Sequence, residues 1–377
     1  MTALRTRSLL VALASAALAA VALAATLAPS ALAQDYRGVS PAAPNPLAGE
    51  RLFVDPFEPS QRHWRSFRNR GKRGSAAAMW KVAREPKFRW FGRFTHNVSK
   101  TVRAYTGRAR RQGSVALMSV MRHQGKACHS RYLAGGRAED ARTRRWYRKF
   151  ARAVGSKRVV IAFEPDSLGT VECLAPHWRE ARYELLRYGV ERLAALPNAT
   201  VYIEAGASDW ISARRMASRL RRAGVAKVRG FMLNVTHFDW TRNNVRYGRE
   251  LSRRLGGKHF IVNTAANGRG PVHYRKRFGG RNRRVNVWCH PLYRGLGRAP
   301  TTQTAHPAAD AYLWISRPGY SSGACNGGPK RAGDWWPRRA LALVRWATDW
   351  LGPRRSLRFG HSRGKLSLRD VAGDQLH

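Results

Sequence analysis

Acidic and aromatic side chains follow several short apolar runs of the sequence. Asp166 comes shortly after the run 159–163, Glu204 ends the run 200–204, and Trp210 lies just beyond it. A carboxylic acid can protonate a glycosidic oxygen, and an indole ring can stack on the face of a sugar. These residue types therefore indicate a carbohydrate site, with Asp166 as the first candidate acid.

The later apolar runs end in similar polar or aromatic residues. Asn234, His237 and Asp239 accompany the run 228–235, and Trp288 closes another short run. No group of His, Cys and acidic residues has the spacing of a metal site. No Gly-x-Ser-x-Gly segment marks a serine nucleophile. We therefore expect neither a metal nor a cofactor.

Each candidate also has an ordinary structural interpretation. Asp166 could cap a helix that begins after the strand, and Glu204 could form a buried ion pair with an arginine. Asp209 and Asp239 could be solvated acids of loops, and the tryptophans could belong to the core. The sequence leaves these alternatives open.

Apolar runs alternate with amphipathic stretches along most of the chain. The runs expected to form strands are 115–121, 159–163, 200–204, 228–235, 260–264, 285–288 and 311–315. The stretches expected to form helices lie near 139–153, 178–195, 211–222, 245–255 and 337–350. Apolar strands that alternate with helices pair in parallel, and about seven such units predict an α/β fold of the (β/α) barrel kind. An open doubly wound sheet is the rival, but no strand is followed by a Gly-x-Gly-x-x-Gly turn.

The chain begins with the features of a secretory signal peptide. Arg5 and Arg7 precede the apolar run 9–27, and an A-x-A cleavage site ends at Ala33. We expect cleavage there, a secreted protein without a membrane-spanning segment, and two disulfides among the four cysteines. An uncleaved membrane anchor is the alternative. The expected organisation is a signal peptide (1–33), an extended lead-in (34–50), a barrel (51–352) and a basic polar tail (353–377).

The chain is strongly basic, with 70 Lys+Arg against 22 Asp+Glu and a net charge of +48. Such a charge attracts anionic lipid, cell-wall polymer or nucleic acid. Beyond the expected signal peptide, the basic residues are scattered from Arg37 to Arg369, and most are arginines in an Ala-rich chain, which fits a coding bias. We therefore expect non-specific binding to anionic surfaces, including the cell wall, and no specific nucleic-acid partner.

The order and spacing of several segments resemble glycoside hydrolase family 6, the cellobiohydrolases and endo-β-1,4-glucanases. These segments, from Asn45 to the region of Leu351, are NPLAGERLFVDP, VVIAFEPDSLGTVECL, VYIEAGASDW, GFMLNVTHF, HFIVNTAANGRGP, VWCHPLYRGLGRAPTT and DAYLWISRPGYSSGACNGGP. The resemblance implies a distorted barrel of parallel strands. It also implies the disulfides Cys128–Cys173 and Cys289–Cys325.

The resemblance also implies roles for single residues. Asp166 matches the family's general acid, and Trp210, Asn234 and Trp288 match positions that contact glucosyl units. The activity implied is hydrolysis of β-1,4-glucan with inversion, in which Asp166 protonates the leaving oxygen.

Several other active-site positions depart from the family pattern. The segment that carries the aspartate supporting the acid reads Lys126-Ala127, and the acidic pair that includes the usual base reads Tyr320 and Ser322. The further departures are Met121 for a tyrosine, Leu133 for a serine, Ser316 for a lysine, Glu204 for an aspartate and Ala207 for a histidine. Without a carboxylate base, activation of the attacking water forfeits about 10²–10⁴-fold in rate.

We therefore expect a secreted β-1,4-glucanase with Asp166 as general acid and Glu204 as the first substitute base, ahead of Asp209 and Asp239. The first alternative is a polysaccharide-binding protein of the same fold that has lost catalysis. The second is an adhesin for anionic polymers or cell surfaces. The salt dependence of binding distinguishes the adhesin from the other two, because binding by charge weakens strongly at high ionic strength whereas stacking on neutral glucan hardly changes.

Overall fold

The computed structural model describes residues 43–122, 136–278 and 280–347. The expected signal peptide, most of the lead-in, the basic tail and the positions Lys126-Ala127, Cys128 and Leu133 lie outside the described residues.

A seven-stranded parallel sheet forms the centre of the protein. Its strands are β1 (Arg89–Gly92), β2 (Ala116–Met121), β3 (Val159–Phe163), β4 (Ala199–Glu204), β5 (Gly230–Leu233), β6 (His259–Asn263) and β9 (Ala309–Leu313). Every neighbouring pair is parallel, and the spatial order of the strands is their order along the chain. A doubly wound sheet would reverse this order at one point. The expected distorted (β/α) barrel of seven parallel strands is confirmed.

The two edges of the sheet approach each other without forming a strand pair. The amide of Phe88 donates to the carbonyl of Trp314 at 3.2 Å, and the indole Nε1 of Trp90 donates to the carbonyl of Ile315 at 2.8 Å. These contacts join the start of β1 to the end of β9. The sheet is therefore curled almost into a closed barrel.

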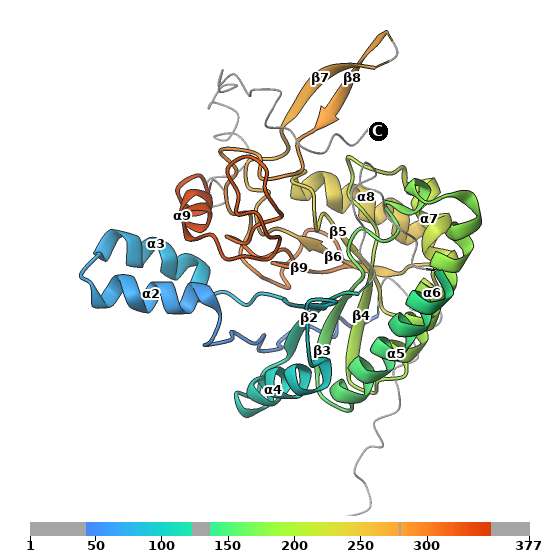
Figure 1. Cartoon of the computed structure of the whole chain (residues 1–377), viewed down its shortest axis with the longest axis horizontal. Coiled ribbons are helices and arrows are strands. Elements are labelled where there is room, and N and C mark those ends of the chain that lie inside the picture. The colour runs from blue at the N-terminus through green and yellow to red at the C-terminus, as the bar shows by residue number, and fades with distance from the viewer. Residues whose placement is uncertain (1–42, 123–135, 279, 348–377) are drawn as a thin grey trace, which may run out of the picture.

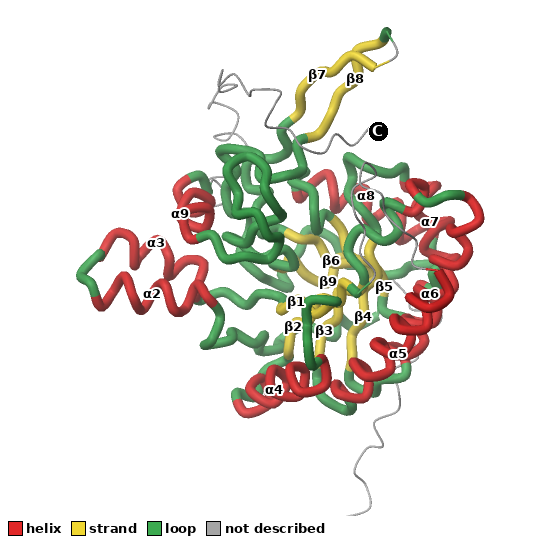
Figure 2. The backbone as a smooth tube through the Cα atoms, viewed as in Figure 1, coloured by secondary structure: helices red, strands yellow, loops and turns green. Residues whose placement is uncertain are grey.

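Helices cover the outer face of the curled sheet (Figure 2). They are α4 (Val98–Arg111), α5 (Gly136–Val154), α6 (Pro176–Ala194), α7 (Ala213–Arg222) and α8 (Thr241–Arg254). Three further helices lie on the side of the molecule away from α5 and α6, and they are α2 (Pro59–Asn69), α3 (Arg73–Ala83) and α9 (Pro337–Arg345) (Figure 1). Within the described ranges, no helix is both long enough and apolar enough to cross a membrane.

Alternate residues of each strand supply two cores. On β3, Val159, Ile161 and Phe163 pack outward against the helices, whereas Val160 and Ala162 point into the barrel. All five residues are fully or almost fully buried. Burial on both faces explains why the parallel strands read as continuous apolar runs.

One predicted strand is wrong and one was missed. The run 285–288 is not a barrel strand, because Val285 belongs to β8 (Arg281–Asn286), which pairs antiparallel with β7 (His273–Phe278). The apolar character of this run has another cause, since Val285 and Val287 are buried at the base of the hairpin. The seventh barrel strand is β1, whose four residues, RWFG, begin with an arginine and give little apolar signal.

Candidate active site

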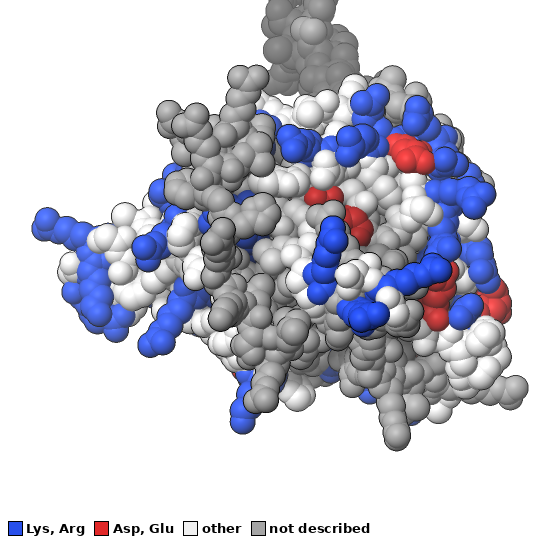
Figure 3. Space-filling view, turned by 90° about the horizontal axis from the view of Figure 1, so that it is seen from above, with Lys and Arg blue, Asp and Glu red and all other residues white. Residues whose placement is uncertain are grey.

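The predicted acids gather at the carboxyl ends of the barrel strands. Asp166 follows β3, Glu204 ends β4, and Asp209 lies in the loop after β4. Figure 3 views the molecule from the end at which the β7–β8 hairpin projects, and it shows acidic side chains near the middle of this face with Lys and Arg around them. The carboxyl end of a parallel barrel is where such folds place their chemistry.

The turns after β3 and β5 hold non-glycine residues in the left-handed region. The φ angles are +57° for Glu164, +67° for Asp166 and +66° for Asn234. Such conformations cost of order 1–3 kcal/mol each and persist only where surrounding contacts impose them. Glu164 supplies two of these contacts, because its fully buried Oε1 accepts from the amide of Arg122 at 3.0 Å and the hydroxyl of Tyr147 at 2.7 Å.

Asp166, the candidate acid, does not cap a helix. Its Oδ1 accepts a 2.6 Å hydrogen bond from the hydroxyl of Thr236, in the loop after β5. Burial raises the pKa of Asp166, and the hydrogen bond from Thr236 and the charge of His237 only partly oppose this effect. The residues that follow form turns and a short 3₁₀ helix (Val171–Cys173), and no described amide donates to the Asp166 carboxylate. The capping interpretation is therefore wrong.

Glu204 holds the turn that carries Asp166. Its Oε2 accepts from the amides of Leu168 at 2.8 Å and Gly169 at 3.2 Å, and its Oε1 accepts from the amide of Gly206. Burial, together with the negative charge of Asp166, raises the pKa of Glu204 to about 7. No ion pair joins Glu204 to an arginine among the described residues, so that alternative is also wrong. With both oxygens occupied, Glu204 is placed to position the acid's loop.

Asp209 and His237 form a pair beside the acid. Asp209 Oδ1 lies 2.8 Å from His237 Nδ1, and Asp209 Oδ2 accepts a 2.5 Å hydrogen bond from Asn286. Burial alone would raise the pKa of Asp209, but the hydrogen bond to His237 and the charge of this histidine lower it overall. His237 follows Thr236 directly, so this pair is one residue from the partner of Asp166.

Asp239 is a buried structural acid instead of a solvated loop residue. It is 4% exposed, and its carboxylate accepts from the Ser208 hydroxyl at 2.5 Å, the Trp240 amide at 2.8 Å and the Asn243 amide group at 3.0 Å. The interpretation of Asp239 as a solvated acid is therefore wrong. Its contacts fix the start of α8.

Asn234 lies below the surface of the site. It is fully buried, and its Nδ2 donates to the carbonyls of Asp239 and Asn263, both at 3.1 Å. Its Oδ1 accepts from the amide of Asp239 at 3.2 Å. The structure therefore uses the whole amide group of Asn234 within the protein, and the predicted contact with a glucosyl unit has no support from this geometry.

Trp210 and Trp288 are both partly exposed. The ring of Trp210 stacks on His237 with centroids 4.8 Å apart and planes at 15°. A Cβ on Gly169 would lie 2.2 Å from this ring, so only glycine lets the indole pack against the loop that follows Asp166. Sugar contact by either tryptophan stays a prediction.

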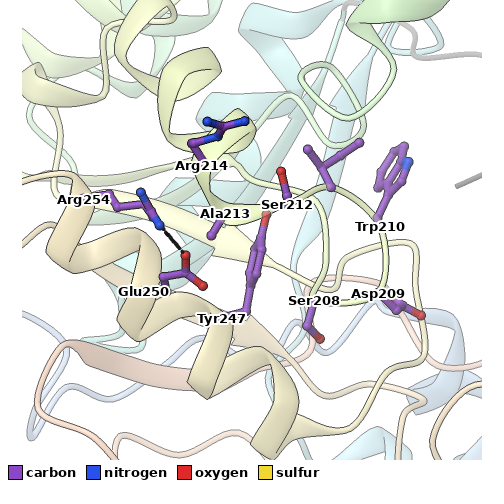
Figure 4. A pocket seen from close by; sticks show the side chains of 10 residues that line it. Ser208, Asp209, Trp210, Ser212, Ala213, Arg214, Tyr247, Glu250 and Arg254 are labelled. Atoms are coloured by element: carbon purple, nitrogen blue, oxygen red, sulfur yellow. Dashed lines mark hydrogen bonds and ion pairs between the residues drawn. The ribbon is translucent and has the colours of Figure 1, made fainter.

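A hollow of about 760 Å³ adjoins the site on the side of α7 and α8. Figure 4 shows Tyr247 and the Glu250–Arg254 ion pair on α8 facing the loop that carries Asp209 and Trp210. Asp166 does not line this hollow. Asp209 and Trp210 line the hollow, and both contact His237, which follows the Asp166 partner Thr236.

Two uncharged residues, Tyr320 and Ser322, occupy the positions of the acidic pair that the family resemblance implies, and contacts with other loops hold them. The hydroxyl of Tyr320 donates to Glu58 Oε1 at 2.8 Å, and the guanidinium carbon of Arg317 lies 3.6 Å from the centre of the Tyr320 ring. The amide of Ser322 donates to His290 Nε2 at 2.6 Å. No local sequence pattern predicts the Glu58–Tyr320 pair, whose members are 262 residues apart.

The expected disulfide Cys289–Cys325 is present. The pairing Cys128–Cys173 stays a prediction, because Cys128 lies outside the described residues. Within the described part of the chain, the group with metal-ligand proximity is Cys289, His290 and Cys325, whose ligand atoms lie within 4.8 Å of one another. Both sulfurs are in the disulfide, so this group offers no thiolate to a metal.

The chain is similar to known proteins over most of its length. The family described as "Glycosyl hydrolases family 6" matches residues 47–347. Endoglucanase A from Cellulomonas fimi is 33% identical over 305 residues, which cover 80% of this chain and 62% of that protein. Endoglucanase 1 from Streptomyces halstedii is 30% identical over 300 residues, 78% of this chain and 88% of that protein.

Solved structures agree with this result. The endoglucanase Cel6 from Mycobacterium tuberculosis, in complex with methyl-cellobiosyl-4-deoxy-4-thio-β-D-cellobioside, is 37% identical with a TM-score of 0.71, over 81% of this chain and 99% of that chain. Endoglucanase CEL6B from Humicola insolens, at 19% identity and a TM-score of 0.67 over 82% of this chain and 100% of that chain, shares the fold. The chain therefore belongs to the glycosyl hydrolases of family 6.

Proposed function

We propose that this protein hydrolyses β-1,4-linked glucan with inversion and that Asp166 is the general acid. The observation that carries the proposal is the Asp166 carboxyl group, held by Thr236 at the carboxyl end of β3 with a raised pKa. A raised pKa keeps an acid protonated near the pH at which it must donate. The endoglucanases among the relatives support glucan as the substrate.

The two oxygens of Asp166 have different tasks in this proposal. Oδ1 accepts from Thr236, and no described residue donates to Oδ2. Oδ2 therefore carries the proton to the glycosidic oxygen as the bond to the leaving sugar breaks. Glu204 keeps the turn at Leu168 and Gly169 in place while this happens.

We infer that the attacking water is activated through other waters rather than by a direct protein base. Inversion places this water on the face of the sugar opposite the acid. Glu204, Asp209 and Asp239 each have both carboxylate oxygens hydrogen-bonded by protein groups. The pKa of Asp209 is lowered, so this group is ionised at neutral pH and stabilises positive charge that develops nearby.

The lack of a carboxylate at Tyr320 and Ser322 favours a second candidate function. These positions bring no carboxylate of their own, and their contacts are to Glu58 and His290. A protein with the glucan site and without efficient water activation would bind polysaccharide and release no sugar. In this alternative the protein has the family fold but does not hydrolyse the glucan that it binds.

Release of reducing sugar from a panel of neutral β-glucans tests the proposal. The wild-type protein should release sugar, and Asp166→Asn should lower the rate by about 10²–10⁴-fold. Glu184→Gln, at an exposed acid of α6, is the matched control and should keep full activity. Equal and negligible rates for wild type and Asp166→Asn, with glucan binding retained at high salt, would establish the binding protein instead.

We also propose that residues 1–33 direct export and are removed. Amino-terminal sequencing of the protein from the culture medium should begin at Gln34. A protein that stays in the cell fraction with Met1 or Thr2 at its start would contradict this proposal.

A further inference from the structure

The β7–β8 hairpin projects from the end of the barrel that carries the site (Figure 1). Its strands contain no Asp or Glu, and their basic residues are Arg275, Lys276, Arg277, Arg281, Arg283 and Arg284. Arg275, Arg277 and Arg281 are exposed, and the structure records no ion pair for them among the described side chains. The hairpin is therefore a basic arm whose strands have no acidic side chain to pair with their cations.

The strand register places like charges opposite one another. Arg275 pairs with Arg284, and Lys276 pairs with Arg283. Like charges directly across an antiparallel pair are destabilising, and a two-stranded hairpin is at best marginally stable by itself. Anions bound at the exposed Arg275 and Arg277 would offset part of the positive charge of the arm.

The base of the arm is anchored in the protein. Tyr274 pairs with Val285, which is fully buried, and the amide of Val287 donates to the carbonyl of Val272 at 2.9 Å. The preceding loop packs on Trp240, the residue before α8, because a Cβ on Gly270 would lie 2.2 Å from the Trp240 ring. The arm is therefore held in a defined direction from its base.

One face of the arm continues into the site. Side chains alternate along a strand, and directly paired residues share a face, so Arg275 and Arg277 lie on the same face as His273 and its partner Asn286. The Asn286 side chain donates to Asp209, which binds His237. Arg275 and Arg277 are about 7 Å apart along the strand. Two exposed cations thus extend outward from the residues next to the acid.

We propose that this face of the β7–β8 arm binds an acidic polysaccharide, through carboxylates carried on the glycan that enters the adjoining site. The proposal rests on the proposed function in that the site takes a glucan chain. A polysaccharide is favoured over nucleic acid because the basic face is continuous, through Asn286, with Asp209 and His237. The strand runs from Arg277 through Arg275 to His273 and Asn286 at the base of the arm, so a chain lying along this face leads toward the site.

Calorimetric titration of full-length protein with carboxymethylated and hydroxyethylated β-glucan of matched length tests the proposal. The titrations use an Asp166→Asn background, so that binding is measured without turnover and separately from any failure of hydrolysis. Arg275→Gln with Arg277→Gln should weaken binding of the carboxymethylated glucan about tenfold at low salt. Binding of the hydroxyethylated glucan should stay unchanged, and the difference should vanish between about 50 and 200 mM salt.

The matched control is Arg103→Gln with Arg110→Gln, two exposed arginines of α4 at the opposite end of the barrel (Figure 1). This pair removes the same charge and should change neither affinity. Equal losses for the two double variants would assign the effect to net charge and overturn the proposal. If the Arg275→Gln, Arg277→Gln variant lost as much affinity for the hydroxyethylated glucan, the arm would be a structural support of the site, and the proposal would be overturned. Tighter arm-dependent binding of a DNA duplex would assign it to nucleic acid.

Discussion

Glu204 accepts a 2.8 Å hydrogen bond from the amide of Leu168, two residues after Asp166. The side chain that ends one strand therefore fixes the turn that follows its neighbour. The same carboxyl group is close enough to Asp166 for the negative charge of Asp166 to contribute to its raised pKa. Position and protonation of the candidate acid are thus linked through Glu204.

The pH dependence of stability should reveal the protonation of Glu204. Its pKa rises from 4.5 to about 7 on folding, so the folded protein keeps a proton that the unfolded chain has released. Stability from this group is present below pH 4.5 and is lost as the pH rises to about 7. The unfolding free energy of wild type should therefore fall relative to Glu204→Gln by about 3 kcal/mol over this range.

Chemical unfolding of both proteins at several pH values measures this difference. Glu184→Gln, which removes an exposed acid, should run parallel to wild type. A wild-type protein that gains stability relative to Glu204→Gln as the pH rises would contradict the raised pKa.

Thr236 should set the alkaline limb of the activity profile. Its hydrogen bond to Asp166 favours the ionised carboxylate and lowers the pKa. Thr236→Val removes that bond, so the pKa of Asp166 should rise and the acid should stay protonated to higher pH. The alkaline limb of kcat/KM should therefore move to higher pH.

Thr236→Ser keeps the hydroxyl and should leave the limb in place. Profiles on one soluble neutral β-glucan compare the three proteins. An alkaline limb that does not respond to Thr236→Val would mean that Asp166 is not the group that titrates there.

Asp209 should act through His237 and Trp210 rather than on the attacking water. It binds His237, on which the Trp210 ring stacks at 4.8 Å. Asp209→Asn should therefore raise KM more than it lowers kcat, with a total loss of about tenfold. Asn286→Ala, which removes the second partner of Asp209, should act in the same direction.

Steady-state kinetics on the same substrate separates the two roles of Asp209. A loss of about 10²–10⁴-fold in kcat with KM unchanged is the signature of a missing general base. That outcome would place Asp209 in direct contact with the water and would replace the water relay.

Much of the barrel could be predicted because parallel strands are buried on both faces. Continuous apolar runs predicted β2, β3, β4, β5, β6 and β9. The strand β1 was not predicted, because it has four residues and begins with Arg89. The run 285–288 was wrongly predicted as a barrel strand, because the base of a projecting hairpin also buries apolar residues, Val285 and Val287 among them.

The sequence predicts those site residues that lie at the ends of strands, but it does not predict their hydrogen-bond partners. Parallel strands bring Asp166 and Glu204 to one edge, which the sequence pattern predicts. The hydrogen-bond partners follow from packing between elements that are distant in sequence. Thr236 is 70 residues from Asp166, and no local pattern distinguishes it from any other threonine in a loop.

Ser322 offers a direct test of whether water activation limits turnover. Its side chain is exposed, and its amide donates to His290 Nε2 at 2.6 Å. Burial lowers the pKa of His290, so the ring is neutral and can accept that bond. Ser322→Asp places an acid where the family resemblance implies one, and it should raise kcat by up to about 10²-fold.

Ser322→Asn is the matched control, because it has nearly the size of the aspartate without its charge, and it should give no gain. Tyr320→Glu should not help, because the new carboxylate would face Glu58, which now accepts from the Tyr320 hydroxyl at 2.8 Å. Initial rates on neutral β-glucan compare the variants with wild type. If Ser322→Asp gives no gain although turnover depends on Asp166, a carboxylate at this loop position is not what limits the reaction, and the water reaches the sugar by a route that this loop does not control.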